Sequence, residues 1–148
     1  MILRGDGDAL LELTVLGYQY PDLVSGGWDA NWLVIQGRVN ANGQVWTFAD
    51  PCLTTWEVQQ LIEWMGVVEG GQAGRTLTFT EPNLAFAQVA TPVPAVRVRL
   101  SHEAAFPWVT GDHKPTEIMC PVALNDWPAV VRSLRDQLAA YPVKVMRA

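Results

Sequence analysis

Four polar side chains lie where the chain is predicted to enter or leave a strand: Asp29, Asn31, Glu81 and Asn83. They belong to two segments, 28–33 and 79–84, that also contain aromatic residues. Carboxylate and amide groups at such positions bind backbone groups that the loop leaves unpaired. We therefore expect a structural role for all four, with hydrogen bonds mainly to loop backbone. Neither segment has the spacing of a known catalytic motif.

Two carboxylates are candidates for acid–base chemistry. Glu81 falls in a predicted turn and Glu103 just past a predicted strand, so they could meet at one end of a sheet as general acid and base. In the structural alternative, Glu81 accepts turn N–H groups and Glu103 pairs with Arg97 or Arg99. We favour the structural alternative, because carboxylates in that role are common.

Other kinds of active site find little support. The chain lacks a Gly-x-Ser-x-Gly motif, and only His102 and His113 could act as near-neutral bases, in or beside a predicted loop at 104–116. The Cys and His residues lack the paired spacing of a zinc site. The glycines of segment 70–74 are followed by neither a lysine nor a helix start, as a phosphate-binding loop requires. We expect no catalytic residue, no metal and no cofactor.

The composition indicates one folded domain over residues 1–148. Hydrophobic residues make up 49% of the chain and charged residues 17%, which argues against disorder. No apolar run approaches the roughly 18 residues of a membrane span. Asp6 and Asp8 lie where a signal peptide would be apolar, so a cytoplasmic location is expected. That compartment favours free thiols at Cys52 and Cys120, although the sequence leaves a disulfide open.

The net charge of −5 is unevenly distributed. Residues 1–74 hold nine acids and two arginines, a net −7, whereas residues 75–148 hold six acids and eight bases, a net +2. Four acids lie in the base-free interval between Arg38 and Arg75: Asp50, Glu57, Glu63 and Glu69. Direct nucleic-acid binding requires clustered bases, which this chain lacks. The acidic half could instead steer a basic protein partner, or it could serve solubility alone.

Hydrophobic periodicity predicts an α+β fold with a mostly antiparallel sheet of about six to seven strands and two amphipathic helices. The expected strands are 10–16, 32–39, 44–49, 75–80, 84–89, 95–101 and 117–124. The Asn-Gly pair at 42–43 predicts a hairpin between the second and third of them.

The two helices are expected over 54–66 and 126–141. Thr54 and Glu57 have the spacing of a capping box at the start of the first, and Pro128 suits the first turn of the second. Both helices should cover the sheet.

Seven tryptophans are many for this length. Trp32 and Trp64 are expected in the interior. The other five lie near loops or element ends: Trp28, Trp46, Trp56, Trp108 and Trp127. We expect about two of these five to be substantially exposed, given the intermediate burial of Trp. An exposed Trp is a typical interface anchor, although it can also be a lid on a small core.

A series of short motifs runs through nearly the whole chain: Leu16–Pro21, Asp29–Leu33, Asp50–Thr54 with Glu57 and Trp64, Phe79 and Glu81–Leu84 with Phe86, Glu103 before Pro107-Trp108, and Tyr141-Pro142. In order and approximate spacing this series resembles the WapI-type immunity proteins. That family is similar to small cytosolic antitoxins encoded beside polymorphic toxins, which act in bacterial competition.

The resemblance implies a non-enzymatic protein that binds a cognate toxin domain and blocks it. The toxin of the name-giving member resembles a nuclease acting on transfer RNA, and a nuclease carries positive charge to hold phosphate. The resemblance brings no binding residues with it. From exposure and charge, the candidate partner-binding residues are Asp50, Glu63, Glu69, Trp28 and Trp108.

Two alternatives to an immunity protein stay open. One is a small-molecule or carbohydrate-binding domain that uses Trp108 and the Glu81/Glu103 region. The other, less favoured, is a hydrolase that uses Glu81 and Glu103. A deep apolar pocket with converging carboxylates would favour these alternatives, whereas a flat acidic face with exposed Trp would favour toxin binding.

Overall fold

The computed structural model describes residues 1–107 and 114–145, and its strands form two four-stranded sheets. The first sheet contains β1 (Ile2–Arg4), β2 (Leu10–Tyr18), β3 (Trp32–Ala41) and β4 (Gln44–Thr54). The second contains β5 (Thr76–Leu77), β6 (Leu84–Val89), β7 (Ala95–Leu100) and β8 (Thr116–Pro121). Each strand pairs antiparallel with its neighbour in sequence, so both sheets are meanders. The predicted α+β class is confirmed.

The first sheet takes its register from hydrophobic alternation and from one turn. Leu11 pairs with Val39, and both are buried. At the β3–β4 turn, Asn42 and Gly43 have φ of 54° and 75°, the left-handed values that an Asn-Gly hairpin requires. Further along, Gly37 lies opposite Phe48, and a Cβ there would come within 2.1 Å of the phenyl ring. Glycine is therefore needed at position 37, because the phenyl ring of Phe48 packs over the backbone of β3 there.

The second sheet follows the same alternation. On β7, Val96, Val98 and Leu100 are fully buried, while Arg97 is half-buried and Arg99 is exposed. Strand β8 is an edge strand that ends at Pro121. A proline suits that position because it has no N–H to donate to a further strand.

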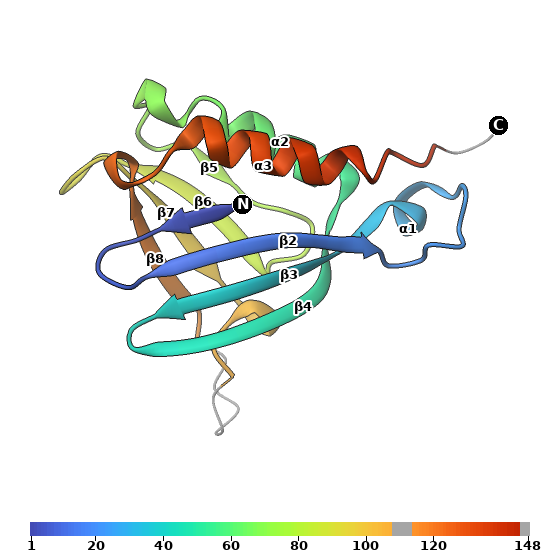
Figure 1. Cartoon of the computed structure of the whole chain (residues 1–148), viewed down its shortest axis with the longest axis horizontal. Coiled ribbons are helices and arrows are strands. Elements are labelled where there is room, and N and C mark those ends of the chain that lie inside the picture. The colour runs from blue at the N-terminus through green and yellow to red at the C-terminus, as the bar shows by residue number, and fades with distance from the viewer. Residues whose placement is uncertain (108–113, 146–148) are drawn as a thin grey trace.

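Two long helices, α2 (Thr55–Met65) and α3 (Trp127–Ala139), lie side by side along one side of the sheets (Figure 1). The capping box of α2 is present as predicted, and Asp126 caps α3. The remaining helical turns are α1 (Gly27–Asn31), η1 (Val68–Gly70), η2 (His102–Ala104) and η3 (Val122–Leu124). Within the described residues, no helix has the length and apolar character that crossing a membrane requires.

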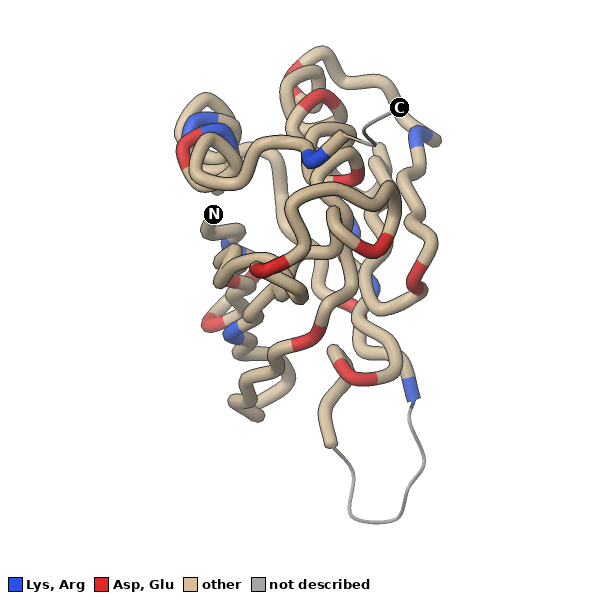
Figure 2. Tube along the Cα trace, turned by 90° about the vertical axis from the view of Figure 1, so that its right-hand side faces the viewer, with Lys and Arg blue, Asp and Glu red and all other residues tan. Residues whose placement is uncertain are grey.

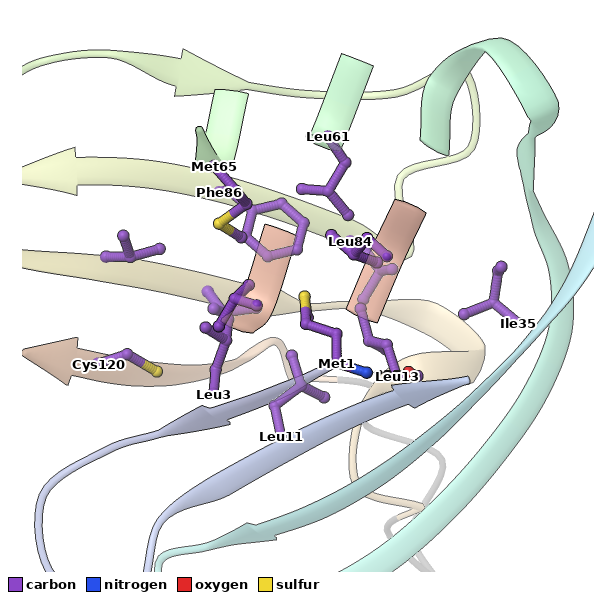
Figure 3. Packing of buried hydrophobic residues seen from close by; sticks show 14 of the residues in the cluster. Met1, Leu3, Leu11, Leu13, Ile35, Leu61, Met65, Leu84, Phe86 and Cys120 are labelled. Carbon is purple, nitrogen blue, oxygen red and sulfur yellow. Dashed lines mark hydrogen bonds between the residues drawn. The ribbon is translucent and has the colours of Figure 1, made fainter. Parts of the chain in front are cut away.

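One hydrophobic core lies between the two sheets and the two long helices. Figure 3 shows side chains from both sheets and from α2 converging, with Leu3 and Leu11 from the first sheet, Phe86 from the second, and Leu61 and Met65 from α2. All five are at most 1% exposed. This burial is what joins the two sheets into one unit.

The structure departs from the sequence prediction in its strands. There are eight strands in two sheets within the described residues, rather than about six to seven in one. Strand β1 was not expected, because three residues are too short for an alternating pattern to stand out. The strand predicted over 75–80 is reduced to β5, because the Thr80 N–H binds the Glu57 carboxylate of α2 instead of a neighbouring strand.

Candidate functional site

Asn83 bridges two carboxylates where the first sheet meets the second. Its Nδ2 atom donates to Asp50 Oδ2 and to Glu103 Oε2, both at 3.1 Å. Asn83 is 1% exposed, and its backbone carbonyl accepts from the Ser101 N–H at 2.9 Å. The expectation that its side chain binds loop backbone is wrong, because β4 and η2 bring Asp50 and Glu103 within reach of the amide.

Asp50 shows the electrostatic effect of this arrangement. Burial raises the pKa of Asp50 above its ordinary value of 3.8, and the charge of Glu103 raises the pKa further. The hydrogen bond from Asn83 acts in the opposite direction, and Glu81 adds a smaller upward effect. Three carboxylates therefore lie close enough to repel one another, which concentrates negative charge at this place.

The two carboxylates considered for hydrolysis do not form an enclosed acid–base pair. Glu81 and Glu103 are both exposed. Within the described part of the chain Glu81 accepts no hydrogen bond, and its turn-binding role stays a prediction. Glu103 binds Asn83 rather than Arg97 or Arg99, because the chain turns at His102, with φ of 52°, and leaves the outward face of β7.

An open hollow lies beside this cluster, and its lining does not include Glu81 or Glu103. The hollow has a volume of about 330 Å³ and is lined by residues such as Phe79, Leu84 and His102. Among the residues that the structure describes, no group of three or more His, Cys, Asp or Glu could hold a metal ion.

Both cysteines are free and buried, in agreement with the preference for free thiols. Burial raises the pKa of Cys52 and of Cys120 to about 12. Nearby carboxylates, Asp50 for the first and Asp6 for the second, add to the effect. Neither thiol is therefore a nucleophile at neutral pH.

Asn31 is a buried junction between three separate parts of the chain. Its Nδ2 donates to the carbonyls of Gly27 and Lys144, each at 2.7 Å. Its Oδ1 accepts from the Lys144 N–H at 2.8 Å and from Thr55 Oγ1 at 3.0 Å. Asn31 thus fastens α1 to the start of α2 and to the C-terminal segment, with bonds to the backbone of Gly27 and Lys144 and to the side chain of Thr55. Asp29, by contrast, is exposed and makes no hydrogen bond within the described residues.

Beside this junction, three indoles from different elements meet at the α1 end of the molecule. The Trp28 ring of α1 lies 5.3 Å from the Trp56 ring of α2 and 6.4 Å from the Trp32 ring of β3, centroid to centroid. Trp28 is 57% exposed and Trp56 36% exposed. Trp32 is half-buried, whereas Trp64 is buried as predicted. The exposed rings of Trp28 and Trp56 form a candidate contact surface.

The remaining tryptophans are engaged elsewhere. Trp46 and Trp127 are buried, and their indole N–H groups donate to the carbonyls of Ala104 and Val122, each at 3.0 Å. Trp108 and His113 lie outside the described residues.

Comparison with protein families identifies the family to which this chain belongs. A model of the immunity protein WapI-like family matches residues 1–142. The chain belongs to the WapI-like immunity protein family. Comparison with curated proteins and with solved structures gave no match. Family membership supports an immunity role and suggests one without catalysis.

The three acids predicted as partner-binding candidates lie in different surroundings. Asp50 is half-buried in the Asn83 cluster, while Glu63 and Glu69 are exposed on and after α2. Glu69 lines a hollow shared with α3, beside Arg132 and Arg135, rather than lying near Asp50. The structure therefore does not gather these acids into one site.

Glu57 serves the fold of the immunity protein. Its Oε2 accepts from the Thr54 N–H and its Oε1 from the Thr80 N–H, both at 2.8 Å, and the residue is 5% exposed. Both oxygens are used internally, so Glu57 is not available to a partner.

Trp56 was not among the candidate partner-binding residues predicted from the sequence. Its position in the first turn of α2, on the side facing away from the buried Val58 and Leu61, was a signal that it would be exposed. No local pattern indicated that Trp56 would meet Trp28 of α1.

Proposed function

We propose that this immunity protein binds a cognate protein toxin and blocks it without catalysis. The match of the family model over residues 1–142 carries the proposal. The carboxylates Glu81 and Glu103, which would serve a hydrolase, do not line the hollow next to them. The exposed indoles of Trp28 and Trp56 are instead of the kind that anchors a protein interface.

The proposed toxin is basic. Residues 1–74 carry a net −7, and Figure 2 shows Asp and Glu residues, with Lys and Arg residues among them, on the side of the molecule that bears α1. A surface of one sign raises the rate of encounter with a partner of the opposite sign. A nuclease fits this requirement, because it must hold phosphate with positive charge. We include exposed Glu63 and Glu69 among the steering charges.

The proposed place of action is the cytoplasm. Cys52 and Cys120 are free thiols, which a reducing compartment preserves. An antitoxin in that compartment meets the toxin where it would do damage.

Co-expression tests the proposal. The gene immediately upstream of this one would be expressed from an inducible promoter in a host that lacks both genes, with and without the immunity protein. We expect induction alone to stop growth, and co-expression to restore it. Purified together, the two proteins should elute as one complex, and the complex should lack the nucleic-acid cleavage that the upstream product shows alone.

Two controls make the outcome decisive. A member of the same family that is encoded beside a different toxin should not restore growth, because protection is expected to be specific to the cognate toxin. If the upstream product is toxic and this protein neither restores growth nor binds it, the proposed function is wrong.

A further inference from the structure

The α1 end carries an exposed apolar surface that internal packing does not account for. Trp28 and Trp56 are joined there by residues of the loop before α1, with Tyr20 47% exposed, Leu23 40% and Val24 78%. Soluble proteins rarely leave several large apolar side chains exposed in one region unless the region contacts a partner.

The indole N–H groups at this surface are available for hydrogen bonding. Those of Trp46 and Trp127 donate to backbone carbonyls inside the protein. Those of Trp28 and Trp56 donate to no group within the part of the chain that the structure describes. Each exposed indole therefore offers a partner both an aromatic face and a free donor.

The surface is also held in place before any partner arrives. The side chain of Asn31 fixes the end of α1 to Thr55, the residue next to Trp56. The Lys144 ammonium donates to the carbonyls of Tyr20 and Pro21, each at 3.3 Å, and lies 3.8 Å from the centroid of the Tyr18 ring. These contacts order the loop in the free protein, which reduces the entropy lost on binding.

The charges that accompany the indoles are negative and unpaired. Asp29 follows Trp28 in α1, and Asp22 lies in the loop that leads into the helix. Both are exposed, and neither forms an ion pair within the described residues. Among the described residues, Lys144 is a cation at this end, and its ammonium group is already occupied by internal contacts. A Lys or Arg side chain placed over an indole would gain both a cation–π contact and a neighbouring carboxylate.

We propose that the indoles of Trp28 and Trp56, with the carboxylates of Asp22 and Asp29, form the contact surface for the toxin and receive basic side chains from it. This inference rests on the proposed function and adds to it the face and the contact chemistry. A second copy of this chain or a small aromatic ligand are the alternative occupants, and charge complementarity favours the basic protein.

Binding measurements on surface variants test the inference. The probe is the purified product of the upstream gene, titrated into wild type, Trp28→Ala, Trp28→Leu, Trp56→Ala and Asp29→Asn. We expect Trp28→Ala to weaken binding by about 30-fold, as a hot-spot residue does. Trp28→Leu should also weaken it, because leucine keeps an apolar surface but has no aromatic face. Asp29→Asn should weaken binding by about threefold at low salt and less at high salt.

Matched controls lie at the opposite end of the molecule, by the β1–β2 loop and the β3–β4 turn (Figure 1). Val45→Ala removes a side chain that is 67% exposed, and Asp8→Asn makes the same charge change as Asp29→Asn. Neither should alter binding. Thermal unfolding of every variant identifies any loss of affinity that comes from loss of fold.

The outcomes separate the two proposals. If wild type binds the upstream product and the folded Trp28 and Trp56 variants bind equally well, the inference is overturned while the proposed function stands. If wild type does not bind, both fail. If wild type sediments as a dimer that Trp28→Ala makes monomeric, with toxin affinity unchanged, the face is a contact between copies and the inference is again overturned.

Discussion

The amide of Asn31 holds the backbone of Lys144 from both sides. Asn31 Nδ2 donates to the Lys144 carbonyl at 2.7 Å, and Asn31 Oδ1 accepts from the Lys144 N–H at 2.8 Å. The two residues are 113 positions apart in sequence. This reciprocal pair anchors the C-terminal segment against α1, at the same end as the exposed indoles of Trp28 and Trp56.

Asn31→Ala is expected to lower the free energy of unfolding by about 1–3 kcal/mol, because it leaves buried backbone groups without partners. Chemical denaturation measures the change. Asp29→Ala is the matched control in the same helix, and since Asp29 is exposed and unbonded its effect should stay within about 0.5 kcal/mol. Equal losses in the two variants would contradict the junction role of Asn31.

Glu57→Ala is expected to lower the free energy of unfolding by about 1–3 kcal/mol, since the Thr54 and Thr80 N–H groups both lose an acceptor. Glu57→Gln keeps one acceptor oxygen and should lose less. Glu63→Ala, at an exposed position of the same helix, serves as control. The idea fails if Glu57→Ala and Glu63→Ala melt at the same temperature.

Asp50→Asn is expected to stabilise the protein at neutral pH and to lose that advantage in acid. The pKa of Asp50 is raised in the folded state, so the folded protein binds the proton more tightly than the unfolded chain. Stability from this group therefore falls as pH rises from 3.8 through the raised value. Asparagine removes the repulsion from Glu103 but keeps an acceptor for Asn83, so the gain at pH 7 should be below about 1 kcal/mol.

Thermal unfolding of wild type and Asp50→Asn between pH 3 and pH 8 measures this difference. The two melting curves should converge toward low pH, where the carboxyl of wild type is protonated. A constant offset across the range would show that the charge of Asp50 is not the cause.

The two cysteines are expected to resist a thiol reagent in the native protein. Burial raises the pKa of Cys52 and Cys120 to about 12, so almost no thiolate is present at pH 8. A colorimetric disulfide reagent should label neither thiol in the folded protein and both after unfolding in guanidinium. Rapid labelling of one thiol in the folded state would contradict its burial.

Reversing the charge of Glu63 or Glu69 is expected to slow association with the toxin more than it speeds dissociation. Both residues are exposed, and charges that lie outside the contact surface act mainly on the rate of encounter. Stopped-flow rates for Glu63→Lys and Glu69→Lys at two salt concentrations test this. Added salt should slow wild type more than the variants. Association of wild type that does not depend on salt would rule out steering.

Local signals located most of the helices and strands. Alternation along β7 predicted the burial of Val96 and Val98, and the spacing of Thr54 and Glu57 predicted the first turn of α2. The Asn-Gly pair predicted the β3–β4 hairpin. Each signal acts between residues close in sequence, where backbone geometry sets the outcome.

The same signals failed where a polar group forms its hydrogen bond with a residue distant in sequence rather than with a neighbouring loop or strand. The Thr80 N–H donates to the Glu57 carboxylate, and Thr80, although predicted to lie in a strand, is not part of β5. Asn83 binds Asp50 and Glu103 instead of its own loop. Glu81, which has the sequence context of a turn-binding acid, remains exposed.

The sequence by itself determined the α+β class, the caps, the hairpin and the lopsided charge, because these follow from residue type and short spacing. Only the tertiary structure decided that the strands divide into two sheets, that Trp28 and Trp56 lie together, and that Asn31 holds Lys144. Those contacts depend on how the sheets and helices pack around a shared core. Burial of that core is a property of the whole chain, which no short pattern encodes.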